Sequence, residues 1–415
     1  MRFRTILLAM MAALVLFGSV GTSHAGLNAV DPGPYSLAFG NFPVWYQDTN
    51  GRALELCINQ TLCLAPVLPD PLAALSFPLN FPDELFWFTG EAAIAGSGVD
   101  LRYVSAIEAA FATAGVTDGQ QITFARIRFV VDVPAAGTYT ITHPYGINVF
   151  EVDAASVGVR AIFSTEDIGI GALGDFTGAL KGNVGPFLVR VDAAGNPSLI
   201  TAPDGVFIGD PAVPQLVTGS PFGTNFIRIQ GPGGIDLRTD LFTVTGKVFA
   251  GALPSPLVVD RTTYSRTALQ TQVDVFATSA PTATLSFTPP ATAMGGDELG
   301  RFFGQALGDP FLSPIDISAD NPLLNNTPVT KTGNVVTDVV SITSVTYTGG
   351  TLVIEASSSD EVSLPTLSFG SSTLTPTGIG ATQSVTVSGL AIPPATVIVT
   401  SSAGGSDTED VVVLP

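Results

Sequence analysis

Short runs in which apolar and polar residues alternate recur along most of this chain of 415 residues, and the clearest lies at 122–145. One face of its first half carries four apolar side chains, Ile127, Phe129, Val131 and Val133. The other face carries Arg126, Arg128, Val130 and Asp132. This two-residue period is that of a half-buried strand. The alternation resumes at 139–143, after a turn-forming Pro-Ala-Ala-Gly segment, so the pattern predicts a β-hairpin.

Runs of the same kind continue to about residue 250, each bounded by Gly, Pro, Asn or Asp. Residues 103–111 fit either a helix face or a strand, and we favour the strand because the hairpin needs a neighbour. We therefore expect an all-β protein. Residues 26–252 would form a large N-terminal β-sandwich domain of two packed sheets with long, glycine-rich loops, whether as one domain or two.

The rest of the chain repeats itself. Residues 284–287 (TLSF) recur letter for letter at 366–369, and residues 259–264 (VDRTTY) match 342–347 (ITSVTY). Such a repeat predicts two tandem units, residues 253–335 and 336–415. Their dense strands, a Tyr near the first strand and the lack of a helical pattern resemble the immunoglobulin-like sandwiches of bacterial surface proteins. The resemblance implies two immunoglobulin-like β-sandwich repeats that lack the disulfide and buried Trp of antibody domains.

Four segments of the N-terminal region carry a second resemblance. They are GPYSLAFGNFPVWYQD (33–48), THPYG (142–146), GIGALGDFTGAL (169–180) and TGSPFGTNFIRI (218–229). Together they resemble an uncharacterised family of exported, β-rich bacterial proteins, over most of residues 26–252. The resemblance brings no activity and no functional residues with it.

The first 25 residues have the form of a signal peptide. Arg2 and Arg4 precede an apolar run at 6–17, and Ser23-His24-Ala25 ends in residues that a signal peptidase accepts. We expect residues 1–25 to be removed and the protein to be exported, to the cell surface or the extracellular space, with the periplasm as the alternative. No second apolar stretch is long enough to span a bilayer.

The charge balance excludes nucleic acid as a partner. The whole chain has 16 basic and 35 acidic residues, and removal of the leader takes away two of the arginines. Binding to a phosphate backbone needs clustered Lys and Arg, and only three lysines follow the leader, Lys181, Lys247 and Lys331. The partners that we expect are a protein or a polysaccharide at the cell surface, with self-association as a further option.

Both cysteines, Cys57 and Cys63, lie in the segment CINQTLC. In an oxidising compartment they would most simply pair with each other as a local cross-link. Redox chemistry of the thioredoxin type would need a C-x-x-C spacing, which is absent.

The tryptophans offer a candidate ligand platform. Trp45 and Tyr46 follow the tripeptide Asn41-Phe42-Pro43, and Trp87 follows the same tripeptide at 80–82. If Trp45, Tyr46 and Trp87 are exposed, they could stack on sugar rings. If they are buried, they pack the sheets, which is the commoner fate of large aromatic residues.

The sequence names no catalytic residues. His143 is the only histidine after the leader, which leaves a Ser-His-Asp triad or a zinc site short of residues. A pair of carboxylates for glycoside hydrolysis could come from Asp83, Glu84, Glu91, Glu166 and Asp167.

We expect no cofactor apart from calcium, whose ligands would be loop carboxylates and carbonyls. The suitable clusters are Asp48/Asn50, Asp192/Asn196, Asp297/Glu298 and Asp407/Glu409/Asp410. None of them matches a defined calcium motif, so the sequence does not say which loop would hold the ion.

The first hypothesis is therefore a non-enzymatic, secreted or cell-surface protein in which a binding or adhesion module is carried on immunoglobulin-like spacer domains. One alternative is a structural protein that assembles into a sheath or filament through exposed strand edges. The other is a secreted glycoside hydrolase that uses carboxylates.

Overall fold

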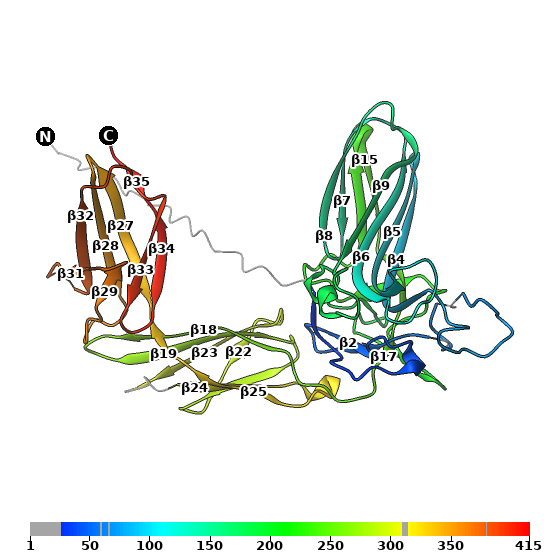
Figure 1. Cartoon of the computed structure of the whole chain (residues 1–415), viewed down its shortest axis with the longest axis horizontal. Coiled ribbons are helices and arrows are strands. Elements are labelled where there is room, and N and C mark those ends of the chain that lie inside the picture. Colours follow the sequence, from blue (N-terminus) through cyan, green and yellow to red (C-terminus); the bar gives the residue numbers. More distant parts are fainter. Residues whose placement is uncertain (1–25, 59, 65–66, 309–313, 379) are drawn as a thin grey trace, which may run out of the picture.

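The computed structural model describes residues 26–415 except 59, 65–66, 309–313 and 379, so the predicted signal peptide lies outside the described residues. Within the described part the protein is all-β, as the alternating pattern predicted (Figure 1). Its strands form seven sheets. The helical segments of the described residues are four short 3-10 turns, η1 (Leu37–Phe39), η2 (Thr177–Lys181), η3 (Pro232–Gly234) and η4 (Pro322–Leu324).

The N-terminal domain, which we define as the described part of residues 27–248, contains three of these sheets. The seven-stranded sheet consists, in spatial order, of β10 (Val189–Arg190), β13 (Gln215–Thr218), β16 (Leu241–Thr245), β4 (Glu84–Gly96), β5 (Val99–Phe111), β6 (Gln121–Val133) and β9 (Gly158–Ile168). The four-stranded sheet consists of β15 (Ile235–Thr239), β14 (Ile227–Gly231), β7 (Gly137–His143) and β8 (Gly146–Val152). The six-stranded sheet consists of β1 (Leu27–Val30), β2 (Trp45–Asp48), β3 (Ala53–Glu55), β17 (Lys247–Val248), β12 (Gly205–Phe207) and β11 (Ile200–Ala202).

The alternation in β6 is used as the sequence predicted. Ile127, Phe129 and Val131 are buried, and Arg126 and Arg128, at alternate positions of the same strand, are half-buried on the other face. The buried face meets the four-stranded sheet, since the Phe129 ring lies 5.4 Å from His143 of β7, between ring centroids. These two sheets therefore form a sandwich, with the apolar side chains of both strands in its core.

The predicted hairpin at 122–145 is wrong. β6 pairs with β5 and β9, whereas β7 pairs with β8 and β14, so the Pro-Ala-Ala-Gly segment carries the chain from one sheet to the facing sheet. The two alternating runs face each other through side chains and not through backbone hydrogen bonds. Both arrangements bury the same alternate positions, so periodicity alone could not separate them. The strand at 103–111 is present as part of β5.

The prediction of two packed sheets in this region was too simple, because the six-stranded sheet adds a third layer at one end of the sandwich (Figure 1). Tyr46 of β2 and Trp87 of β4 lie edge to face with 4.8 Å between ring centroids. The Tyr46 hydroxyl contacts Thr123 Oγ1 at 2.7 Å and donates to the carbonyl of Phe176 at 2.8 Å. One continuous core therefore joins all three sheets.

The rest of the described chain forms two successive units. In the middle unit, one sheet contains β22 (Gly295–Gly296), β23 (Arg301–Leu307), β19 (Thr271–Ser279), β18 (Leu257–Arg266) and β26 (Thr337–Asp338). Its second sheet contains β21 (Thr292–Ala293), β20 (Thr284–Thr288), β24 (Ile315–Asp320) and β25 (Val329–Asn334).

The C-terminal unit has the same plan. One sheet contains β31 (Thr375–Pro376), β32 (Thr382–Ser388), β28 (Thr351–Ser358), β27 (Val340–Thr348) and β35 (Val412–Val413). The other contains β30 (Ser372–Thr373), β29 (Leu367–Phe369), β33 (Thr396–Ser401) and β34 (Ser406–Asp410).

The sequence repeat corresponds to a structural repeat. The nine strands β18–β26 and the nine strands β27–β35 follow the same order in their sheets. Even an irregularity recurs, because the register shifts between Val259 and Arg261 in β18 and between Ile342 and Ser344 in β27. Both shifts fall within the matched segments VDRTTY and ITSVTY.

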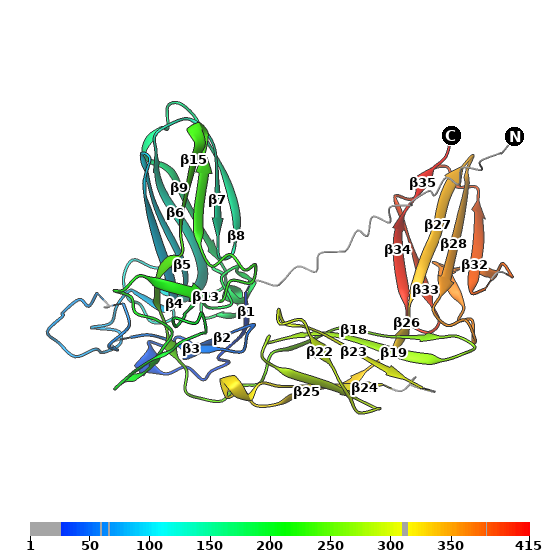
Figure 2. The same ribbon diagram turned by 180° about the vertical axis from the view of Figure 1, so that it is seen from behind.

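The three parts of the chain follow one another in space (Figure 2), and polar contacts join them. At the first joint, Gln47 Nε2 donates to the carbonyl of Pro254 at 3.0 Å, and Asn326 Nδ2 donates to the carbonyl of Gly51 at 3.0 Å. At the second joint, Arg266 of the middle unit forms an ion pair with Asp360 of the C-terminal unit. Polar groups that are buried at such joints need partners, and these contacts supply them. The contacts therefore help to hold the three parts of the chain together.

Candidate functional site

A groove of about 560 Å³ runs across the outer face of the seven-stranded sheet, on the side away from the sandwich core. Its volume lies in the range typical of ligand pockets. The lining residues come from β4, β5, β6 and β16 and from the flanking segments, and they are Glu91, Ala92, Ala93, Arg102, Tyr103, Val104, Arg128, Val130, Pro214, Thr239, Leu241 and Thr243.

The strand register explains why the polar residues of this groove meet. Thr243 pairs with Glu91, Glu91 pairs with Val104, and Val104 pairs with Arg128, so these residues form one row across four strands. In the next row, Ala93 pairs with Arg102, which pairs with Val130. Paired residues of a sheet point to the same face. Two arginines and one glutamate therefore surround a floor of short apolar side chains.

The charged groups of the groove have few partners within the described residues. The side chain of Arg102 forms no ion pair or hydrogen bond there, and Arg128 donates from Nε to Thr165 Oγ1 at 3.1 Å. Elsewhere, six basic residues are tied to carboxylates: Arg126, Arg228, Arg238, Lys247, Arg266 and Arg301. Within the part of the chain that the structure describes, the guanidinium of Arg102 and the two Nη groups of Arg128 therefore have no protein partner and can meet a ligand.

Glu91 is the one carboxylate among the residues that line the groove. Burial raises the pKa of Glu91 above its ordinary value, and no charged neighbour opposes that shift. Farther along the same face, Asp100 and Asp132 pair directly across β5 and β6. The face is therefore of mixed charge, because the row of Arg102 lies between the Asp100–Asp132 pair and the row that holds Glu91 and Arg128.

An acidic cluster lies beyond the other end of the groove. Nη1 of Arg126 lies 2.9 Å from Glu108 Oε2 and 3.6 Å from Glu84 Oε1, and its Nε lies 2.7 Å from Asp167 Oδ1. Burial and the hydrogen bond with Glu84 raise the pKa of Glu108 to about 9, although the charge of Arg126 acts in the opposite direction. Glu108 therefore carries a proton at neutral pH, and the cluster ties four adjacent strands together.

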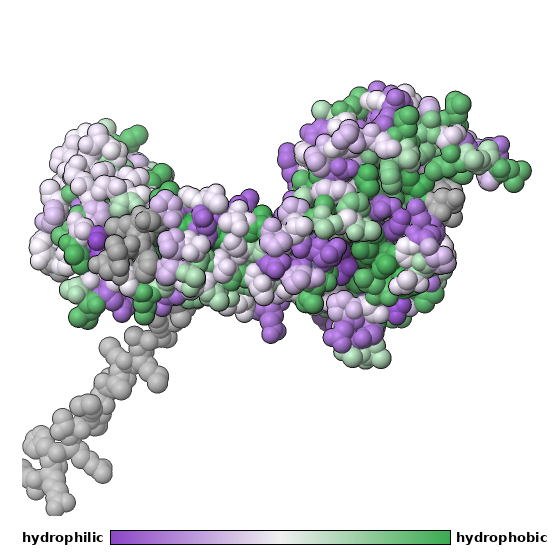
Figure 3. Space-filling view, turned by 90° about the horizontal axis from the view of Figure 1, so that it is seen from below, coloured by the Kyte–Doolittle hydropathy of each residue, from purple (hydrophilic) through white to green (hydrophobic). Residues whose placement is uncertain are grey.

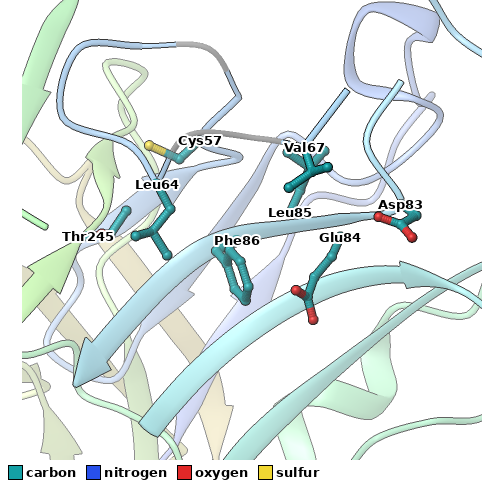
Figure 4. A pocket seen from close by; sticks show the side chains of 8 residues that line it. All are labelled: Cys57, Leu64, Val67, Asp83, Glu84, Leu85, Phe86 and Thr245. Carbon is teal, nitrogen blue, oxygen red and sulfur yellow. The ribbon is translucent and has the colours of Figure 1, made fainter. Parts of the chain in front are cut away.

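Glu84 also borders a small pocket of about 90 Å³ at the start of β4 (Figure 4). Asp83 and Glu84 lie at one side of this pocket, and Cys57, Leu64 and Thr245 lie at the other. Its volume is well below that of ligand pockets, so it offers no room for a sugar ring.

The acids that the sequence suggested for hydrolysis are spread over different places. Glu84 and Asp167 meet at Arg126, whereas Glu91 lies in the groove. Glu166 is separate from both and accepts from Asn148 Nδ2 at 3.5 Å. Glu108, whose pKa is raised most among these carboxyl groups, was not among the candidates from the sequence. An alternating strand pattern shows that its side chain points outward, but it does not show that neighbouring residues bury it.

Of the two alternatives for the aromatic residues, packing between the sheets holds for Tyr46 and Trp87. Trp87 and Tyr46 are fully buried, and Trp87 Nε1 donates to the carbonyl of Val44 at 3.2 Å. Trp45 is half-buried and packs against Phe249 with 6.1 Å between ring centroids. Tyr46 and Trp87 hold the six-stranded sheet against the sandwich, and their burial is why these two residues are not available to a ligand.

The predicted disulfide is confirmed. Cys57 and Cys63 are bonded, with 5.6 Å between their Cα atoms, and both pack against Phe207.

His143 is buried between the sheets, where its Nε2 contacts Asn148 Oδ1 at 2.9 Å. Burial lowers the pKa of His143 to about 4, so the ring is neutral at physiological pH and serves the core.

The loop acids proposed for calcium already accept hydrogen bonds from the backbone. Asp48 accepts from the N–H groups of Arg52 and Phe187, and Asp192 accepts from those of Ala194 and Asn196. Within the described residues, no group of three or more His, Cys, Asp and Glu side chains is placed to hold a metal ion. Calcium stays a prediction without a site.

One feature of the sequence could have indicated the groove, namely the position of two of its few basic residues. The chain is poor in basic residues, and Arg102 and Arg128 occupy outward positions of two strands that are neighbours in sequence. The register that brings Glu91 and Thr243 to them depends on pairing between distant segments, which no local pattern contains.

The surface of the molecule seen from below mixes apolar and polar residues (Figure 3). No helix of the described residues is long and apolar enough to cross a bilayer. No family model matches the chain, and no curated protein matches it. The fold and the groove are thus the grounds on which a function can be argued.

Proposed function

We propose that this is an exported, non-enzymatic binding protein whose N-terminal domain engages a protein or polysaccharide at the cell surface through the groove over β4, β5 and β6. The observation that carries the proposal is a groove of ligand-pocket size lined by two arginines, Arg102 and Arg128, that form no ion pair within the described residues. Specific sites commonly combine a largely apolar lining with a few polar groups that fix orientation.

The middle and C-terminal units act as a spacer in this proposal. Their common strand order, with β18 next to β19 and β23 in one sheet and β20 next to β24 in the other, supports an immunoglobulin-like assignment. Arg266, Tyr264 and Asp360 bind the two units to each other through buried contacts. A stiff pair of units would hold the groove at a distance from whatever anchors the other end.

The lining of the groove favours binding over glycoside hydrolysis. Most glycoside hydrolases need two carboxyl groups on either side of the scissile bond, and Glu91 is the only one among the lining residues. The other acid cluster is tied to Arg126 and borders the pocket of about 90 Å³, which has no room for a sugar ring. A hydrolase is therefore the weaker proposal.

The test is to block the groove in the intact chain. Ala93 lies exposed on the floor, so Ala93→Trp should fill the groove without disturbing the core. Cell-envelope polysaccharide and protein fractions should retain the unaltered protein and not the variant. Ala95→Trp, at the next outward position of β4 but outside the lining, is the matched control. Equal retention of the unaltered protein and Ala93→Trp would rule out the groove as the binding site.

A second candidate function, self-association, is favoured by one edge strand. β8 ends the four-stranded sheet, pairs with β7 without a bulge, and exposes Ile147 (66%) and Val149 (60%). Unprotected apolar edges readily pair with another chain. Sedimentation velocity over a range of concentrations tests it: association should disappear in the Ile147→Lys, Val149→Lys double variant, and a protein that stays monomeric throughout excludes it.

A further inference from the structure

The groove also carries information about the class of its ligand, and this inference rests on the function proposed above. A guanidinium group presents its N–H donors as a planar fork that matches the two oxygens of a carboxylate or the oxygens of a sulfate. Arg102 and Arg128 are diagonal neighbours on β5 and β6, a geometry that places Cα atoms about 7–8 Å apart. Both can therefore reach one anionic group.

The rest of the lining matches a hydroxyl-rich body. Glu91 and the hydroxyls of Thr239 and Thr243 stand along the groove on the β16 side, opposite the arginines. Between them the floor is formed by short or branched side chains, Ala93, Val104 and Val130, with no deep apolar hole. Such a floor can contact the C–H face of a sugar ring while its hydroxyls meet the polar rim.

A peptide is less suited to this place. Extended peptides commonly bind by adding a strand to a sheet edge, and apolar helices bind in deep apolar grooves. β4, β5 and β6 are central strands whose backbone groups pair with neighbours on both sides. The backbone N–H and C=O groups beneath the groove are therefore already hydrogen-bonded within the sheet. A ligand in the groove must be recognised by side chains.

We infer that the groove binds an anionic saccharide, with its acid group on Arg102 and Arg128 and its ring hydroxyls on Glu91, Thr239 and Thr243. Asp100 and Asp132, which stand beside Arg102 at the far end of the same face, keep the acid group on the Arg128 side. The whole chain is strongly acidic, with a formal charge of −19. Attraction for the anion is therefore local to the two arginines and should weaken with salt.

Titration calorimetry of the intact exported chain, residues 26–415, tests the inference with four probes. These are trigalacturonate, its carboxyl-reduced neutral counterpart, a sulfated galactose trisaccharide and a hexaglutamate peptide. We expect one or both anionic saccharides to bind at least about tenfold more tightly than the neutral one, since hydrogen bonds to charged groups carry that much discrimination. The comparison of uronate with sulfate identifies the acid group.

The variants locate the binding. Arg102→Gln and Arg128→Gln should each weaken the anionic saccharide at least about tenfold. Lys331→Gln, which removes the same charge from an exposed position of the middle unit, should leave the affinity unchanged. Circular dichroism of each variant checks the fold.

Three outcomes would overturn the inference, and they leave different things standing. Equal affinity for the neutral saccharide, lost in Ala93→Trp, would reject the anionic ligand and keep the binding groove. Binding of hexaglutamate alone would replace the saccharide by a peptide. Failure of all four probes would reject the anionic saccharide, while the envelope-fraction experiment with Ala93→Trp would still decide whether the groove binds at all.

Discussion

Arg266 and Asp360 belong to different units of the chain, and they form an ion pair inside the joint between those units. Nε of Arg266 donates to Asp360 Oδ1 at 3.1 Å, and the hydroxyl of Tyr264 donates to Oδ2 at 3.1 Å. The backbone repeats the link, because Arg266 N donates to the carbonyl of Ser359 at 2.9 Å. The side chain of Asp360 is 1% exposed, so removal of Arg266 leaves a buried carboxylate without its cation, held only by neutral hydrogen-bond donors.

We expect Arg266→Ala to loosen this joint, because an unpaired buried carboxylate costs several kcal/mol. The units should separate more freely, which small-angle X-ray scattering would record as a broader distribution of intramolecular distances. Arg301→Ala is the matched control, since it breaks an exposed ion pair with Asp297 in the same unit and should change little. Identical scattering from both variants would contradict a stiff joint.

The same joint should weaken in acid. Burial acts to raise the pKa of Asp360, but the hydrogen bonds from Arg266 and the backbone outweigh it and lower the pKa to about 2. A lowered pKa contributes stability above the ordinary value of 3.8, about 2 kcal/mol here, and this contribution is lost as the pH falls towards 2. Thermal unfolding between pH 5 and pH 2 should show a steeper loss for the unaltered protein than for Asp360→Asn.

Glu108 predicts the opposite pH dependence in the N-terminal domain. Its pKa rises from 4.5 to about 9, so the folded protein holds a proton that the unfolded chain releases above pH 4.5. The contribution of Glu108 to stability is therefore fully present below pH 4.5 and is lost as the pH rises towards 9. Glu108→Gln, which keeps the shape and removes the titration, should be more stable than the unaltered protein at pH 8, by urea unfolding, and differ least at pH 5.

Two controls make the Glu108 experiment decisive. Asp118→Asn removes a carboxyl group that is exposed at the surface of the same domain and should not reverse the pH trend. A Glu108→Gln variant that is less stable than the unaltered protein at pH 8 would mean that the carboxylate is charged and needed by Arg126.

Trp87 should be essential for stability and irrelevant to ligand binding. It is fully buried between β2 and the sandwich, so Trp87→Ala should lower the free energy of unfolding by about 3–5 kcal/mol. Trp87→Phe should cost less, because it keeps an aromatic ring in the site. Denaturant unfolding measures both, and an unfolding free energy that Trp87→Ala leaves unchanged would mean that Trp87 is not in the core.

The disulfide should contribute about 2 kcal/mol to stability, the value that the chain-entropy account gives for so short a loop. We therefore expect the Cys57→Ser, Cys63→Ser double variant to fold and to unfold at a lower temperature in calorimetry. A loss of stability larger than about 2 kcal/mol would mean that the double variant also disturbs the packing of both cysteines against Phe207. Reduction of the unaltered protein with dithiothreitol should reproduce the shift.

Local sequence patterns predicted the strands better than their partners. The alternation at 127–133 predicted a half-buried strand and gave its buried face correctly, and the repeat of TLSF predicted two units of like construction. The pairing of β6 with β9 and not with β7 could not be predicted, because a turn within a sheet and a turn between sheets bury the same side chains.

The site was harder to predict than the fold for a related reason. The sequence suggested a ligand platform from the large aromatic residues Trp45, Tyr46 and Trp87. Tyr46 and Trp87 are buried because the third sheet packs on the sandwich, which the sequence did not predict. Arg102 and Glu91 are unremarkable in sequence and become neighbours through the pairing of β4 with β5. A groove on the face of a sheet is a property of register, and register is set by the whole domain.

The pairing of β17 with β3 sets the order in which the N-terminal domain can fold. Lys247 donates to Glu55 at 2.6 Å over a separation of 192 residues, and β16 closes onto β4 just before it. A chain that emerges N-terminus first cannot complete either sheet until residue 248 is free. Contacts so distant in sequence make folding slow, and β3, which pairs with β2 on one side and β17 on the other, must wait with an unpaired edge that invites association with other chains. The domain should therefore form as one late, cooperative event.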